Sequence, residues 1–122
     1  MTLNLKDLMA NGGFVSEPRV ERDINWTNDQ GEELSAKAWI RRESYHTLTT
    51  TWKQQESHKD YLAVRVATMV CDAEGGPILR PEDVTGTESR GPMCANLFLA
   101  LLTAVNEVNS GKSKPPTTSG SN

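Results

Sequence analysis

Few residues in this chain have the types and spacing that catalysis, nucleotide binding or metal binding requires. Gly111-Lys112-Ser113 resembles the end of a phosphate-binding loop, but Asn106 stands where the first glycine should be, and a helical pattern precedes it instead of a strand. His46 and His58 have no Cys or carboxylate at the spacing of a zinc site, and Ser44 and His46 do not share a face of a helix. We therefore expect no nucleotide, metal or cofactor site and no catalytic nucleophile.

Four carboxylates gather around one loop, at Asp72, Glu74, Glu82 and Asp83. Oxygen-rich clusters can bind calcium, but the regular ligand spacing and the turn of a calcium loop are missing. We interpret Asp72 and Glu74 as turn residues, and Glu82 and Asp83 as charges at the positive end of a short helix. The alternative is a minor enzyme or regulatory domain with a site assembled from Asp72, Glu74 and His58.

Composition excludes several classes of partner and location. The chain has 122 residues with 13 basic and 16 acidic side chains, a formal net charge of −3. Because this balance offers no basic field for phosphates, nucleic acid is not an expected partner. We find no secretory signal and no apolar run of membrane-spanning length, so no membrane association is expected. Cys71 and Cys94 lack C-x-x-C spacing and are expected to be free, buried thiols of an intracellular protein.

Alternating side chains predict a β-hairpin in the first part of the chain. Arg19 to Thr27 and Glu33 to Arg42 each place apolar residues at every second position, and Asn28 to Gly31 has the composition of a tight turn. Ahead of the hairpin, Leu3 to Met9 has a short amphipathic helical pattern that stops at Asn11-Gly12-Gly13.

Helical patterns follow the hairpin. Ser44 is a helix N-cap, and Tyr45, Leu48 and Trp52 are spaced for one face of the helix that it starts. Residues 56–71 fit both a strand and a helix, because alternating valines coincide with a polar stripe at helical spacing. We favour the helix, since the segment is long for a single strand.

The last third of the chain contains a short helix from Pro81 and a long helix from Pro92 to Asn109. Residues 110–122 include no aliphatic or aromatic side chain, so burial cannot offset the entropy lost on ordering them. The predicted fold is α+β, a small N-terminal β-hairpin packed with a mainly helical remainder of three to four helices. It forms one domain over residues 1–109, followed by a disordered tail over residues 110–122.

The long helix carries more apolar surface than a helix covered on one side needs. Phe98, Leu99, Leu102 and Val105 widen its apolar arc well beyond the roughly 100° stripe of a surface helix. We expect these four side chains to contact another subunit or a protein partner. The alternative is a central helix that the domain covers on both sides. The expected core stripe consists of Met93, Leu97, Leu101, Ala104 and Val108.

A second candidate contact patch lies on the return strand of the hairpin. Trp39 and Arg41 alternate with Ala38 and Ile40, so Trp39 points away from the apolar face. Trp and Arg are enriched in the hot spots of protein interfaces. We expect this patch to face solvent or a partner, the alternative being a Trp that lies over the outer face of the hairpin.

Several short stretches occur in a recognisable order: Leu3-Asn4-Leu5-Lys6-Asp7-Leu8, Phe14-Val15, Gly31-Glu32-Glu33, Ala38-Trp39-Ile40-Arg41-Arg42, Val70-Cys71-Asp72-Ala73-Glu74-Gly75-Gly76-Pro77-Ile78-Leu79, Glu82-Asp83-Val84, Leu97-Phe98 and Val108-Asn109. Together they resemble the tail assembly chaperones of long-tailed, lambda-like bacteriophages. Members of that family typically carry a turn of the Asp-x-(Asp/Glu)-Gly-x-Pro type, an acidic helix start and a final Leu-Phe-rich helix ending in Asn. The resemblance runs from about residue 3 to residue 109.

The resemblance implies a protein that binds the long, helical, aggregation-prone tape measure protein, keeps it soluble and extended, and helps recruit tail tube protein before leaving the finished tail. It also implies self-association, action in the host bacterial cytoplasm, and a function without catalytic residues or cofactors. Such a client would be bound by helix-in-groove contact. The alternative is another phage morphogenesis oligomer, such as a head-tail connector or a tail terminator.

Many relatives in that family make a longer form by programmed ribosomal frameshifting, which adds a segment that engages tube subunits. Gly111 and Lys112 fit such a point of divergence, because Gly-Lys can be encoded by a slippery G-then-A run and follows the end of the last helix. An ordinary frayed terminus is the alternative.

Overall fold

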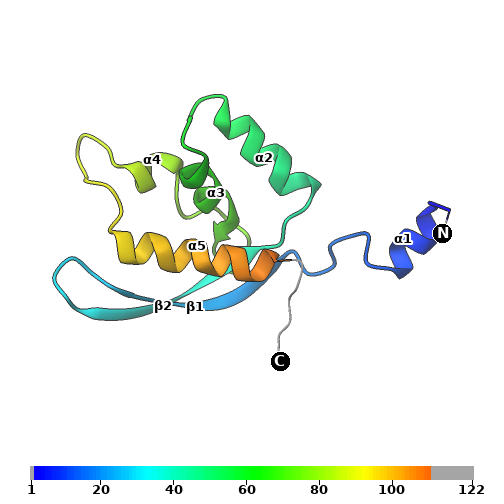
Figure 1. Ribbon diagram of the computed structural model, residues 1–122, viewed down its shortest axis with the longest axis horizontal. Helices are drawn as coiled ribbons and strands as arrows, with labels where there is room; N and C mark the ends of the chain where they lie inside the picture. Colours follow the sequence, from blue (N-terminus) through cyan, green and yellow to red (C-terminus); the bar gives the residue numbers. More distant parts are fainter. Residues whose placement is uncertain (1, 111–122) are drawn as a thin grey trace.

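A computed structural model describes residues 2–110 of the chain. The described part combines a three-stranded antiparallel sheet with five helices, so the fold is α+β as predicted. Figure 1 shows the elements, which in chain order are α1 (Leu5–Ala10), β1 (Arg19–Thr27), β2 (Glu33–Arg41), α2 (Tyr45–Gln55), α3 (Tyr61–Met69), β3 (Val70–Cys71), α4 (Pro81–Thr85) and α5 (Ala95–Asn109). The strands lie in the order β1-β2-β3.

The predicted hairpin forms between β1 and β2. Its register pairs Arg19 with Arg41 at one end and Thr27 with Glu33 at the other. At the turn, the Oδ1 atom of Asn28 accepts hydrogen bonds from the backbone N–H groups of residues 30 and 32, both at 2.9 Å. Gly31 has φ +83°, a value that favours glycine. The turn therefore forms where Asn28 and Gly31 stand in the sequence.

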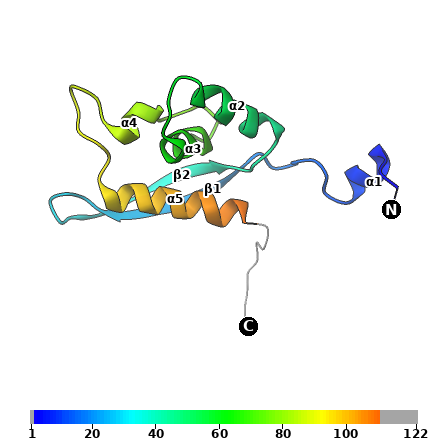
Figure 2. The same cartoon turned by 45° about the horizontal axis from the view of Figure 1, so that its top comes forward.

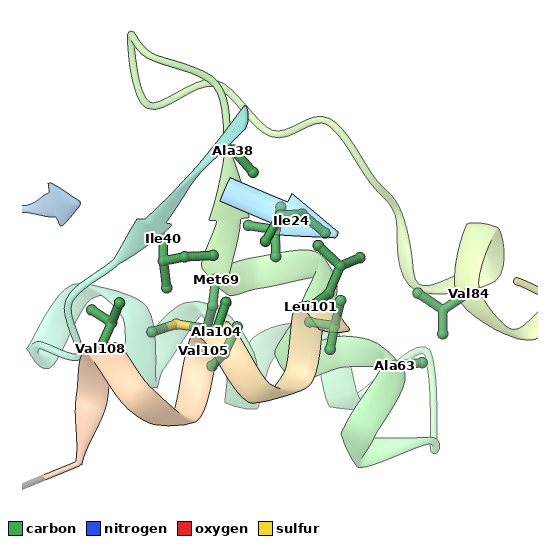
Figure 3. Close-up of a cluster of buried hydrophobic side chains, with 12 residues drawn as sticks. Ile24, Ala38, Ile40, Ala63, Met69, Val84, Leu101, Ala104, Val105 and Val108 are labelled. Carbon is green, nitrogen blue, oxygen red and sulfur yellow. The ribbon is translucent and has the colours of Figure 1, made fainter. Parts of the chain in front are cut away.

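Helix α5 lies along one face of the sheet and forms the centre of the domain. It packs on β1 and β2 and also on α3, while α2 and α4 pack on α3 from farther out (Figures 1 and 2). Figure 3 shows Ile40 from β2, Met69 from α3 and Val105 from α5 meeting in the core, and all three side chains are fully buried. The helical side of the molecule is therefore two helices deep.

The opposite face of the sheet carries charge. The Nζ atom of Lys37 on β2 lies 2.9 Å from an Asp23 carboxylate oxygen and 3.5 Å from a Glu21 carboxylate oxygen on β1. The hydrogen bond to Asp23 raises the pKa of Lys37, and the charges of Asp23 and Glu21 act in the same direction. An antiparallel sheet with one apolar and one polar face accounts for the alternation seen in both strands.

Residues 56–71, whose pattern fitted both a helix and a strand, contain one of each. Asp60 caps α3, since its Oδ1 atom accepts the Ala63 N–H at 3.0 Å, and the helix runs to Met69. The predicted helix is therefore confirmed for residues 61–69. It is wrong for residues 56–60, which form the turn and loop between α2 and α3. It is also wrong for Val70 and Cys71, which form β3 because they pair with Ile40 and Trp39 along the free edge of β2.

The start of the long helix also differs from the prediction. The helix begins at Ala95 instead of Pro92, with Cys94 as its extended N-cap residue. The Met93 N–H donates a hydrogen bond to the Val84 carbonyl at 3.0 Å, which ties this segment to the end of α4. Cys94 has extended backbone angles, φ −66° and ψ 150°, so the first helical residue is Ala95.

Residues 2–17 contribute little to the body of the domain. Helix α1 forms where the sequence predicts, with Asn4 as its N-cap, but none of its side chains is buried. Both views of the molecule show α1 apart from the sheet and from the other helices (Figures 1 and 2).

Candidate interaction surfaces

Most of the apolar excess predicted on α5 is used inside the domain. Val105 has 0% of its surface exposed, and Phe98 and Leu102 are partly buried against the same core. The expected contact role of Val105 is therefore corrected, because its side chain lies between the sheet and α3. The arc is wide because α5 is covered on two sides, which was the alternative left open by the sequence.

Leu99 is the predicted α5 residue that reaches the surface, with 54% of its area exposed. It lies on the side of α5 that faces the outer edge of β1. There, Leu99 and Thr103 of α5 and Asp23 and Asn25 of β1 line a shallow groove. The rest of the lining mixes apolar residues such as Ala100 with charged ones such as Arg22 and Glu107. The β1 wall is the edge strand of the sheet, which pairs with β2 on one side and with no strand of the described residues on the other.

Trp39 and Arg41 occupy the other face of the sheet, away from the α5 groove. Trp39 is partly exposed, as its alternation predicts. The guanidinium group of Arg41 donates from Nε to the Thr68 carbonyl at 2.9 Å and from Nη2 to the Gly75 carbonyl at 2.5 Å. Arg41 thus ties the end of α3 and the loop after β3 to the sheet, a structural role that the sequence analysis missed.

Helix α2 exposes an apolar stripe formed by Tyr45, Leu48 and Trp52, named the α2 stripe below. Tyr45 is 84% exposed and Trp52 is 60% exposed, while Thr47 and Thr51 are the buried residues of the helix. The sequence showed the stripe but not its direction. The direction could have been predicted from Thr47 and Thr51, which mark the buried side of the helix. A threonine hydroxyl can donate to the backbone carbonyl one turn earlier, so it can be buried without losing its hydrogen bond. Thr51 does this to the Thr47 carbonyl at 2.9 Å.

The N-terminal arm (residues 2–17) is a further apolar surface outside the predicted sites. Its large apolar side chains remain exposed. They are Leu3, Leu5, Met9, Phe14 and Val15. Such a set on an element without buried residues indicates a surface that is completed by another molecule.

The acidic residues have the local roles that their positions predict. Asp72 Oδ1 accepts backbone N–H groups of Glu74 and Gly76 at 3.0 and 2.8 Å, so it organises the turn after β3. Asp83 accepts the Arg80 N–H at 2.7 Å at the start of α4 and pairs with Arg90. The backbone hydrogen bond from Arg80 lowers the pKa of Asp83, with further lowering by the Arg80 and Arg90 charges.

Histidine and cysteine side chains are not assembled into a reactive centre in the described residues. Over residues 2–110, no group of three or more His, Cys, Asp or Glu is placed to hold a metal ion. His58 lies beside Thr85, with 3.4 Å between Nε2 and Oγ1. Cys71 and Cys94 are free, as expected, although Cys94 is only partly buried. Burial raises the pKa of the Cys71 thiol, which disfavours its reactive thiolate.

Gly111, Lys112 and the rest of the predicted tail lie outside the described residues. Within residues 2–110, no helix has the combined length and apolarity needed to cross a lipid bilayer.

The chain matches a family of known proteins. A family model described as "Phage tail assembly chaperone, TAC" matches residues 6–109, which run from the first turn of α1 to the last residue of α5. No curated protein and no solved structure matches the chain.

Proposed function

Because the chain belongs to the phage tail assembly chaperone family, a family of structural, non-catalytic phage proteins, we propose that it binds the tape measure protein of its phage and keeps it soluble during tail morphogenesis. In this role it also helps to recruit tail tube protein and is absent from the finished tail. It acts in the cytoplasm of the infected bacterium without catalysis of its own. The observation that carries the proposal is the family match over residues 6–109, nearly the whole described domain.

We propose that the groove centred on Leu99 is the main contact for the client. A long helical protein presents apolar side chains at helical spacing, and exposed Leu99 offers them an apolar contact in this groove. Leu99 would insert between client side chains, with partly buried Phe98 and Leu102 supporting it from the same helix. Trp39 on the opposite face is proposed as a second contact, held in place by the sheet that Arg41 ties to α3.

Self-association belongs to the same proposal. A tape measure protein is long relative to a domain of this size, so several copies are needed to cover one client. Exposed apolar surface on the arm and on α2 offers a physical means for copies to meet.

We further propose that a longer form of the chain carries the contact with tail tube protein. Gly111 and Lys112 are the proposed frameshift point, directly after Ser110. The nucleotide sequence tests this part alone. A slippery heptamer over the codons for Gly111 and Lys112 is expected, and its absence would remove the longer form from the proposal.

The decisive experiment is co-expression of the full chain with the tape measure protein from the same phage gene cluster. We expect a soluble complex with several copies of the chain per client, measured by pull-down and light scattering. An insoluble client that does not associate, together with stoichiometric copies of the chain in purified virions, would contradict the proposal and favour a connector or terminator.

The client surface is tested with Leu99→Gln in the same co-expression. Glutamine keeps helix propensity but removes the apolar contact, so we expect at least a tenfold weaker complex and more insoluble client. The matched control is Ile78→Gln, since Ile78 is equally exposed at 52% but lies in the loop before α4. Equal client binding by the two variants would reject the Leu99 groove as the contact.

A further inference from the structure

The N-terminal arm has a defined local structure although it contacts little of its own domain. Asn4 Oδ1 accepts the Asp7 N–H at 2.9 Å at the start of α1. At the other end, Gly12 has φ +76° and the Gly13 N–H donates to the Leu8 carbonyl at 2.7 Å. The sequence therefore encodes both the start and the stop of this helix.

Such a helix is not stable by itself in water. Isolated helices shorter than about 12 residues are marginal even with favourable sequences, and α1 has six residues. Helices of this kind persist when an apolar face is covered by another element. No residue of α1 is buried by the rest of the described chain, so the cover must come from elsewhere.

The same chain exposes a surface of matching character. The α2 stripe is apolar, belongs to an eleven-residue helix with a complete N-terminal capping box, and is rigidly backed by α3. Both halves of one contact are thus present in every copy.

The base of the arm lies beside the start of its own α2, where Phe14 and Val15 line one hollow together with Tyr45. The Arg42 N–H donates to the Pro18 carbonyl at 2.8 Å, which fixes residue 18 at the end of the hairpin. Bends at residues 14, 16 and 17 turn the chain between α1 and β1. Helix α1 itself lies apart from the α2 of its own chain in both views (Figures 1 and 2).

We propose that the N-terminal arm docks on the α2 stripe of a second copy of this chain. The inference rests on the self-association proposed above and names its contact. Each copy gives one arm and receives one. Leu5 and Met9 of α1 lie against Leu48 and Trp52 of the neighbour, and α1 is stabilised only in the assembled state.

The area available fits a stable pair. Aromatic side chains bury about 150–250 Å² each, so the exposed parts of Phe14, Tyr45 and Trp52 amount to roughly 400 Å² per copy. With the exposed leucine and methionine side chains added, a reciprocal exchange buries on the order of 1,200 Å² or more, which reaches the size of specific interfaces.

Full-length variants test the contact through sedimentation velocity over a wide concentration range. Leu5→Gln with Met9→Gln changes the arm, and Trp52→Gln changes the α2 stripe, while glutamine preserves helix propensity at these exposed positions. We expect each variant to raise the dissociation concentration at least tenfold, with unchanged thermal unfolding of the dilute chain. The control Ile78→Gln, at a similarly exposed position in the loop before α4, should associate as the unaltered chain does. Arm and stripe variants that associate like the unaltered chain would overturn the inference.

Cysteine pairing identifies which copy receives the arm. In a Cys94→Ser background, chains with Met9→Cys are mixed with chains carrying Leu48→Cys, and oxidation should link the two different chains. Met9→Cys mixed with Leu34→Cys, at an exposed position in β2 near the hairpin turn, should not link. A single chain with both Met9→Cys and Leu48→Cys that closes on itself at high dilution, without links between chains, would show cis docking and overturn the inference.

The same variants separate this inference from the proposed function. Client solubility is measured by co-expression with each variant. If the unaltered chain solubilises the client and the arm variants still assemble, the arm contact is wrong while the chaperone role stands. If the unaltered chain leaves the client insoluble, the chaperone role fails whether or not arms are exchanged.

Discussion

Helices α5 and α2 use their apolar residues in opposite ways. Helix α5 has the wider apolar arc, yet it buries Leu101, Ala104, Val105 and Val108 and leaves Leu99 as its one large exposed hydrophobic residue in the described chain. Helix α2 has a narrow apolar stripe and turns it to solvent, with threonines on its buried side. The position of a helix within the layers, and not its apolar width, decides which side chains are covered.

The difference follows from what lies on each side of the two helices. The sheet covers one side of α5 and α3 covers another. Helix α2 is an outer element that packs on α3. Its buried side carries Thr47 and Thr51, whose hydroxyl groups donate hydrogen bonds to backbone carbonyls one turn earlier. An apolar stripe on an outer helix is then free for another molecule.

The largest expected effect compares two leucines on α5. Leu101→Ala removes a side chain that is 5% exposed and should lower the free energy of unfolding by about 2–5 kcal/mol. Leu99→Ala on the same helix should change it by about 0.5 kcal/mol or less. Urea denaturation of both variants measures the difference, and equal losses would show that Leu99 is also covered in the isolated chain.

Asn109 gives the next effect, because it joins the end of α5 to the end of β2. Its side chain accepts the Glu43 N–H at 2.6 Å and donates to the Arg41 carbonyl at 3.0 Å. Asn109→Ala leaves these partly buried groups unpaired and should lower the free energy of unfolding by about 1–3 kcal/mol. Asn106→Ala, at an exposed position of the same helix, is the control. Equal stability of the two variants would show that the Asn109 side chain does not stabilise the junction between α5 and β2.

Within α2 the cap should matter more than the buried hydroxyl. Ser44 Oγ accepts the Thr47 N–H and its own N–H donates to Thr47 Oγ1, at 3.3 and 2.9 Å. Ser44→Ala should cost about 1 kcal/mol of unfolding free energy. Thr51→Val should be close to neutral, since the carbonyl it contacts stays in the helix and valine keeps the shape. A large loss for Thr51→Val would mean that α2 depends on that hydroxyl for its orientation.

Acid should weaken the start of α4, through protonation of Asp83. The pKa of Asp83 is lowered in the folded chain, so its contribution to stability is present above its ordinary value of 3.8 and is lost as pH falls through the lower folded value. Asp83 starts α4, whose Val84 carbonyl binds the Met93 N–H ahead of α5. We expect Asp83→Asn to reduce the drop in thermal midpoint between pH 6 and pH 3, at roughly one degree or less. If the thermal midpoint of Asp83→Asn falls as much as that of the unaltered chain, Asp83 does not contribute to acid sensitivity.

Local patterns were sufficient to predict most of the fold. The hairpin, its turn, the Ser44 cap and the helix stop at Gly12 all depend on residues close together in the chain, and each is confirmed. The strand at Val70 depends on a partner far away in the chain, β2. Such partners are invisible to a reading of periodicity.

The candidate surfaces were harder to predict for the same reason. Val105 was assigned to a surface because the sequence cannot show that α3 covers the second side of α5. The α2 stripe and the arm were recognised as amphipathic, but an amphipathic pattern does not say whether the apolar side meets its own chain or another. Trp39 was placed on the correct face because strand alternation fixes direction once the core face is known.

The Asn109 contacts with β2 also give the molecule a directional end. The Arg42 N–H binds the Pro18 carbonyl, and Asn109 binds the neighbouring Arg41, so the base of the arm and residue 110 leave the domain at the same pole. The hairpin turn lies at the other pole (Figure 1). The described chain therefore enters and leaves the body of sheet and helices at one pole, opposite the hairpin turn.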